Sequence, residues 1–134
     1  MYLIITRAFP PELGGMQSLM WGLTKEMSKN FMIKVFADYQ QNHKEFDKNQ
    51  NFSIERVGGI KFLRKIRKAQ LINQFLKENK VQGIIADHWK SLELIKTDKK
   101  KICLIHSKEI NHDKGSFSNK RILKILNNNY IFNA

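Results

Sequence analysis

Short apolar runs alternate with longer amphipathic stretches along this chain. The runs contain many β-branched residues and are apolar nearly throughout rather than at every second position. That pattern is typical of strands buried on both faces of a parallel sheet. It predicts strands at 2–5, 32–37, 52–57, 81–86, 101–105 and 130–132.

Between these runs, apolar residues recur at the spacing of an α-helix. The longest such stretch places Phe62, Ile66, Ala69 and Ile72 on one face, which we expect to be buried. Ser118 is the expected N-cap of the last helix. The pattern predicts helices at 16–29, 61–79, 91–96 and 118–127, and loops at 39–51 and 107–115.

Strands that alternate with helices favour a parallel sheet covered on both faces. We therefore predict an α/β fold, a Rossmann-like parallel sheet with helices on both faces, with a strand order close to 3-2-1-4-5-6. In that order the loops after the first, fourth and fifth strands face one crevice. Gly14–Gly15, Asp87–His88 and His106 follow these strands and should therefore lie together.

The junction between the first strand and the first helix is the most distinctive local feature. Pro10 and Pro11 force an extended exit from the strand, and Gly14 and Gly15 stand immediately before the helix that opens at Met16. Exposed amides at a positive helix end favour anions, and two glycines allow a ligand to approach the backbone. Alternatively, the glycines only allow a sharp turn from the strand into the helix. The spacing matches neither a nicotinamide-binding fingerprint nor a P-loop.

The composition and charge of the chain indicate which partners it could bind. Lysine and arginine number 24 against 12 acidic residues, a formal net charge of +12, so the chain should attract nucleic acid, an anionic membrane surface or phosphorylated substrates. No apolar run is long enough to span a membrane, and no signal-peptide pattern is present, so we expect a cytoplasmic protein. The single cysteine, Cys103, lies in an apolar run and is expected to be a buried structural thiol.

The stretch Phe9-Pro10-Pro11-Glu12-Leu13-Gly14-Gly15-Met16-Gln17, followed by Leu19 and Leu23, resembles the amino-terminal signature of family 4 glycosyltransferases of the GT-B fold. The resemblance implies that residues 1–134 form the amino-terminal, acceptor-side Rossmann-like domain, one half of a GT-B architecture. The donor domain, with its Glu-x7-Glu motif, has no counterpart here. We therefore expect either a truncated chain that stops before its closing helix or a donor half on a separate polypeptide.

The resemblance also implies functional residues. His106 and Glu109 match the family's His-Gly-x-Glu segment, with Ser107 in place of the glycine, and His106 would contact the transferred sugar. A histidine that only caps a loop is the alternative. Asp87 and His88 follow the fourth strand and would line the acceptor pocket, although a structural hydrogen-bonding role fits equally well.

The expected function is that of a retaining glycosyltransferase, inactive as this half alone. It would transfer a sugar from a nucleotide-sugar donor to a glycan or lipid-linked acceptor in the synthesis of cell-envelope glycans. Gly14 and Gly15 would bring backbone amides to the donor's phosphate or sugar. No cofactor is implied, and no residue spacing matches a metal site. The alternative is a non-catalytic basic module that binds polyanions, either nucleic acid or an anionic membrane. Nucleic acid is disfavoured because no known nucleic-acid signature is present.

Four cations, Lys61, Arg64, Lys65 and Lys68, fall at positions i, i+3, i+4 and i+7 of the 61–79 helix. They form either a solvated face or a dock for anionic lipid. The second interpretation predicts a peripheral protein on the inner face of the membrane.

Overall fold

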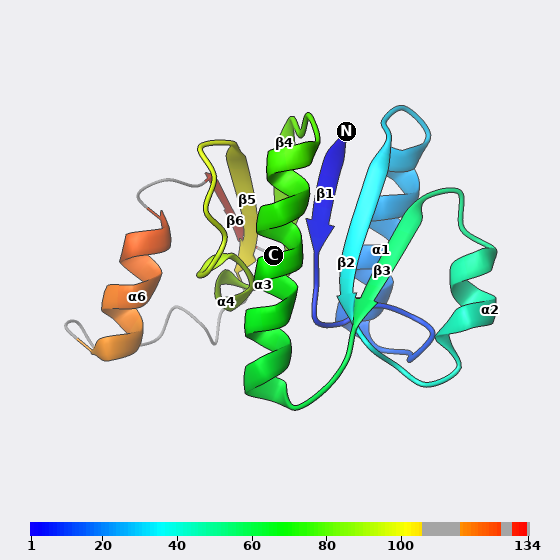
Figure 1. Ribbon diagram of the computed structural model, residues 1–134, viewed down its shortest axis with the longest axis horizontal. Helices are drawn as coiled ribbons and strands as arrows, with labels where there is room; N and C mark the ends of the chain where they lie inside the picture. Colours follow the sequence, from blue (N-terminus) through cyan, green and yellow to red (C-terminus); the bar gives the residue numbers. More distant parts are fainter. Residues whose placement is uncertain (106–115, 127–129, 134) are drawn as a thin grey trace.

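The computed structural model describes residues 1–105, 116–126 and 130–133 (Figure 1). Its centre is one six-stranded sheet in which every neighbouring pair of strands is parallel. The order is β3-β2-β1-β4-β5-β6, which confirms the predicted Rossmann-like arrangement. The strands are β1 (Tyr2–Ile5), β2 (Ile33–Asp38), β3 (Ser53–Val57), β4 (Gly83–Ala86), β5 (Lys100–Ile105) and β6 (Tyr130–Asn133).

Helices cover both faces of this sheet, with α3 in front of it and α1 behind it in Figure 1. Side chains alternate between the two faces along each strand because the strand period is two. Leu3 and Ile5 therefore pack with residues of α3 and α4, whereas Ile4 packs with residues of α1. The helices are α1 (Gly15–Ser28), α2 (His43–Lys48), α3 (Lys61–Glu78), α4 (Trp89–Leu92) and α6 (Phe117–Leu126).

The pairing of β1 sets the position of the functional edge. It pairs with β2 on one side and β4 on the other, with Ile5 opposite Phe36 and Ala86. β1 and β4 consequently end at the same level, and β2 runs two residues further, to Asp38. The residues that follow them share the carboxyl edge of the sheet at the point where the strand order reverses, which is where open α/β sheets bind ligands.

Three local predictions are wrong. Residues 43–48 form α2 although 39–51 was predicted as a loop, because Phe46 packs edge-to-face against Phe9 and Trp21. Helix α4 begins at Trp89, not at residue 91, because the His88 side chain caps it. The last helix is capped by Ser116 instead of Ser118. The Ser116 hydroxyl accepts a hydrogen bond from the Asn119 amide at 3.1 Å.

The predicted buried face of α3 is also wrong in part. Phe62 is 70% exposed, whereas Lys68 is 5% exposed and Ile72 is fully buried. The amino end of α3 extends past the carboxyl ends of the strands (Figure 1), and Phe62 is the second residue of this helix. The buried face therefore runs through Lys68, Ala69 and Ile72.

In the part of the chain that the structure describes, every helix is too short or too polar to cross a bilayer.

The orientation of α3 can be tested by two truncations on the same helix. We expect Ile72→Ala to lower the free energy of unfolding by about 2–5 kcal/mol, because it opens a cavity in the core. Phe62→Ala should change it by less than about 0.5 kcal/mol, because the ring is exposed. Urea unfolding followed by circular dichroism measures both. A larger loss for Phe62→Ala than for Ile72→Ala would contradict this orientation.

Candidate functional site

A cleft of about 420 Å³ lies at the carboxyl edge of the sheet. It brings together Met16, at the start of α1, with residues that follow β1 and β4 and with Asp38 at the end of β2. The lining consists of Arg7, Ala8, Met16, Asp38, Lys61, Arg64, Asp87 and His88. This is the crevice that the predicted strand order requires, and it joins elements more than 80 residues apart in the chain.

The glycine turn leaves the amino end of α1 open. Gly14 is the N-cap residue, with a φ of 175° that any residue can adopt, and no side chain caps the helix. A Cβ on Gly14 would meet only the flexible end of the Gln17 side chain, and a Cβ on Gly15 would have nothing within 4 Å. Neither the backbone conformation nor the packing at Gly15 therefore requires glycine, while the absent side chain leaves the first-turn amides accessible.

The loop that carries this turn is held from three sides. Phe9 is fully buried, and the Arg56 guanidinium donates a hydrogen bond to the Pro10 carbonyl. Arg56 is itself oriented by Asp47, with an Nη2–Oδ1 distance of 2.7 Å. The backbone N–H of Glu12 donates to the Gln40 side chain at 3.1 Å. These contacts fix the position of Gly14 and Gly15 beside the cleft.

Asp87 connects two of the loops. Its Oδ2 accepts hydrogen bonds from the Thr6 hydroxyl at 2.9 Å and from the Arg7 backbone N–H at 2.7 Å, and its Oδ1 accepts one from the Ser91 hydroxyl at 3.1 Å. The carboxylate is 3% exposed. Asp87 therefore acts as a structural residue that ties the end of β1 to α4.

His88 lies beside Asp87 and lines the cleft. Its Nδ1 accepts a hydrogen bond from the Lys90 backbone N–H at 3.0 Å, so Nδ1 is unprotonated and caps α4. The ring lies 5.6 Å from the Trp89 ring, centroid to centroid. His88 is thus held in one orientation at the cleft wall.

The four predicted surface cations do not form a solvated stripe. Lys68 Nζ lies 2.5 Å from Asp38 Oδ1 and donates to the Thr6 carbonyl at 3.0 Å, while Arg64 Nε lies 3.2 Å from Asp38 Oδ2. Lys65 pairs with Glu93 at 2.5 Å. Only Lys61 among the four is exposed. The prediction that all four could meet a membrane surface is therefore wrong, because Arg64 and Lys68 pair with Asp38 and Lys65 pairs with Glu93.

Glu93 joins α3 to α6. Its carboxylate accepts two hydrogen bonds from the Arg121 guanidinium, at 2.5 and 2.7 Å, in addition to the Lys65 ion pair. The hydrogen bond to Arg121 is the main cause that lowers the pKa of Glu93 from 4.5 to about 2, against the opposing effect of burial, and Lys65 lowers it further. The same contact raises the pKa of Arg121.

Two predicted site residues, His106 and Glu109, lie outside the described residues. Within the described ranges, no group of three histidine, cysteine or carboxylate side chains is arranged to hold a metal ion. Cys103 is buried, as predicted.

Sequence reasoning missed Asp38, Arg56, Arg7 and Lys90 as residues of the site. Asp38 ends β2 and Arg7 is the second residue after β1, and polar residues at such positions are candidates for the carboxyl edge. Arg56 carries no comparable signal, because Pro10 and Asp47 are brought to it only by the tertiary fold. Lys90 carries none either, since it is one of many lysines in the chain.

The chain matches no known protein-family model and no curated protein sequence. The geometry of the cleft therefore carries the functional argument.

The Glu93 network predicts a pH-dependent stability. Because folding lowers the pKa of Glu93, its contribution is complete above pH 4.5 and is lost as the pH falls toward about 2. We expect Glu93→Gln to be less stable than the wild type at neutral pH, and the difference to close on acidification through this window. Glu26→Gln removes one carboxylate from an exposed pair and controls for the loss of charge. A gap between Glu93→Gln and wild type that stays constant with pH in chemical unfolding would contradict this assignment.

Proposed function

We propose that this chain forms the acceptor-side half of a retaining glycosyltransferase that uses a nucleotide-sugar donor. The observation that carries the proposal is the glycine turn at the uncapped amino end of α1, directly before Met16, which lines a cleft at the reversal point of a parallel sheet. Gly15 supports it most directly, because the fold itself would accept a side chain there.

The chemistry follows from the amides. The backbone N–H groups of the first turn of α1 have no intrahelical acceptors, and the helix dipole adds positive potential there. Negative charge that develops on a departing diphosphate would be stabilised by these donors. A fixed array of donors needs no reorganisation as the charge develops, which is why such arrays accelerate group transfer.

The opposite wall of the cleft would receive the acceptor. His88 is fixed there by the cap of α4, and Asp87 holds the two loops together instead of contacting the acceptor itself. His106 would contact the transferred sugar, as its resemblance to the family motif implies. The donor's nucleotide would be held mainly by a second domain, supplied in cis or in trans.

The role of the glycine turn is tested by Gly15→Val. In a transfer assay with this chain and a donor-side domain, we expect the rate to fall on the order of a hundredfold, because the valine side chain would keep the phosphate from the first-turn amides, and the loss of one such contact typically costs this much. The thermal midpoint should stay near that of the wild type, because a Cβ at this position meets nothing within 4 Å. Gly22→Val is the matched control, since Gly22 lies in the same helix and is equally unobstructed.

Full transfer by the folded Gly15→Val variant would refute the role of the turn. Robust transfer by the 134-residue chain without a donor-side domain would refute the division of labour between two halves.

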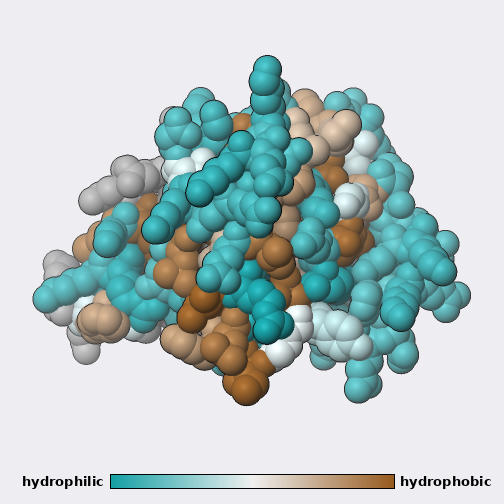
Figure 2. Space-filling view, viewed as in Figure 1, coloured by the Kyte–Doolittle hydropathy of each residue, from teal (hydrophilic) through white to brown (hydrophobic). Residues whose placement is uncertain are grey.

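We also propose that the domain contacts a membrane surface through the amino end of α3. Ile60, Phe62 and Leu63 are 73%, 70% and 52% exposed, and Lys61 and Arg67 are exposed beside them. Figure 2 shows apolar surface gathered at this end of the molecule. Apolar side chains flanked by cations suit the interface of an anionic bilayer.

The contribution of the apolar side chains to membrane binding can be separated from the contribution of charge. We expect Phe62→Ser with Leu63→Ser to abolish most co-sedimentation with vesicles that contain anionic lipid, because the apolar anchors are lost. Lys48→Gln with Lys77→Gln, two exposed lysines elsewhere, should weaken binding only slightly. Equal losses for the two double variants would mean that binding is a general charge effect and would overturn the proposed contact.

A further inference from the structure

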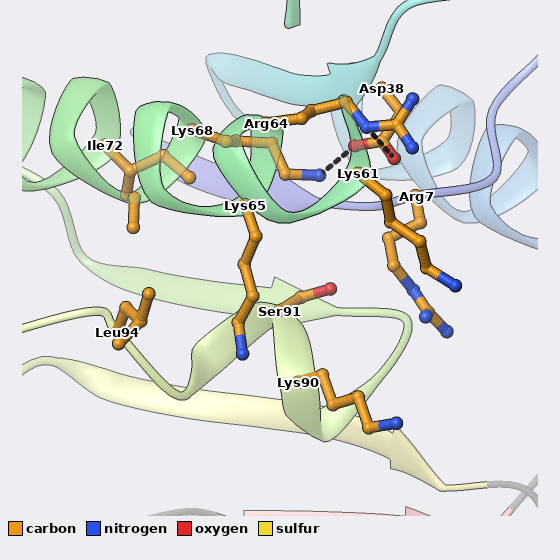
Figure 3. A pocket seen from close by; sticks show the side chains of 11 residues that line it. Arg7, Asp38, Lys61, Arg64, Lys65, Lys68, Ile72, Lys90, Ser91 and Leu94 are labelled. Carbon is orange, nitrogen blue, oxygen red and sulfur yellow. Dashed lines mark hydrogen bonds and ion pairs between the residues drawn. The ribbon is translucent and has the colours of Figure 1, made fainter. Parts of the chain in front are cut away.

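A smaller cavity of about 110 Å³ adjoins the cleft, between α3 and α4 (Figure 3). Its apolar lining consists of Ala69, Ile72 and Leu94, and Leu94 is 40% exposed. The cavity shares four lining residues with the cleft: Arg7, Asp38, Lys61 and Arg64.

Six cations surround this cavity: Arg7, Lys61, Arg64, Lys65, Lys68 and Lys90. A single carboxylate, Asp38, serves both Arg64 and Lys68. Glu93, which pairs with Lys65, is shared with Arg121. The positive charge at the cavity therefore exceeds the local negative charge even before the remaining three cations are considered.

Those three, Arg7, Lys61 and Lys90, form no ion pair within the described part of the chain. In Figure 3 the side chains of Arg7 and Lys61 extend beside each other, and Lys90 extends from α4 on the opposite wall. All three are exposed, and Lys90 Nζ lies 5.3 Å from the centre of the Trp89 ring. All three line the same cavity, and an anion bound there would interact favourably with each of them.

We propose that this cavity binds a phosphate or diphosphate group carried on an apolar chain. The anionic group lies on Arg7, Lys61 and Lys90, whose charged donors suit phosphate oxygens. The first carbons of the chain lie against Ile72 and Leu94. The inference deepens the proposed function, on which it rests for the statement that this ligand is the acceptor.

The apolar lining residues indicate that the ligand carries a hydrocarbon part as well as an anionic group. A free phosphate would leave Ala69, Ile72 and Leu94 without a partner, whereas an attached hydrocarbon gains from covering them. Ile60, Phe62 and Leu63, which are exposed beside Lys61 in the sequence, would contact the rest of the hydrocarbon or the bilayer that holds it. A volume of about 110 Å³ admits a compact head group and excludes a stretch of nucleic acid.

The test is calorimetric binding of decyl phosphate, kept below its micelle-forming concentration, to the full 134-residue chain. We expect saturable binding that weakens about tenfold or more when Arg7, Lys61 and Lys90 are all replaced by glutamine. The matched control replaces Lys48, Lys77 and Lys80, three exposed lysines away from the cavity, and should bind like the wild type. Equal weakening of the two triple variants would overturn the site.

Inorganic phosphate distinguishes the two sources of the anionic group. We expect it to bind more weakly than decyl phosphate, and Leu94→Asn to weaken decyl phosphate binding alone. If Leu94→Asn leaves both unchanged, or if both ligands bind equally, the apolar chain is refuted. Displacement of decyl phosphate by a random oligonucleotide at equal phosphate concentration would likewise overturn the proposal in favour of a nucleic-acid surface. Circular dichroism confirms that each variant is folded.

This outcome is independent of sugar transfer. Binding of decyl phosphate with no transfer in the two-domain assay would leave the cavity assignment intact and refute the enzymatic role. Sugar transfer without binding of decyl phosphate would support the enzymatic role and refute the cavity assignment.

Discussion

Strand β1 pairs in parallel with β2 on one side and β4 on the other, and the whole cleft depends on this arrangement. The pairing brings the carboxyl ends of three strands to one edge of the sheet, with β2 running two residues further than β1 and β4, so the segments after Ile5, Asp38 and Ala86 emerge at that edge. The carboxylate of Asp87 then ties the first of these segments to α4, through the Arg7 backbone and the Ser91 hydroxyl. A slip of one residue in the register of β1 would move its apolar side chains to the wrong face and separate these loops.

Two partly buried charge clusters keep the loops in place after the strands have ended. Arg56 orders the proline loop and α2 from the outer side of the sheet, and Asp38 orders the amino end of α3 by accepting Lys68 and Arg64. Breaking a buried pair of this kind by removing one partner is strongly destabilising, because the other charge stays buried. The consequence for function is that the glycine turn, the cleft and the neighbouring cavity form on elements whose positions are fixed before any ligand arrives.

Much of the fold was predictable from the sequence, because the continuous apolar strands and the alternation of strands with helices reflect burial on two faces. The strand order followed from it. Of the residues expected to lie together, Asp87 and His88 line the cleft, whereas Gly14 and Gly15 do not and are represented there only by the next residue, Met16. The orientation of α3 did not follow from the pattern, because periodicity counts apolar residues and cannot see that the amino end of α3, with Phe62, extends past the carboxyl ends of the strands. Nor can it see that Lys68 is buried, since its partner Asp38 lies 30 residues away in the chain. The short helix α2 was missed for the same reason: Phe46 is held by Phe9 and Trp21, which only the tertiary fold supplies.

The central claim is that the carboxyl edge of the sheet, at the amino end of α1, is where this protein meets a phosphorylated ligand. An NMR titration of the isotopically labelled chain with a nucleoside diphosphate tests it directly, by mapping which backbone amides shift. The account predicts that the largest shifts fall on residues 14–17 and on Arg7, with little change at the opposite edge around Phe31 and Met32. Shifts centred on that opposite edge, or spread evenly over exposed lysines with the first turn of α1 unaffected, would contradict the account.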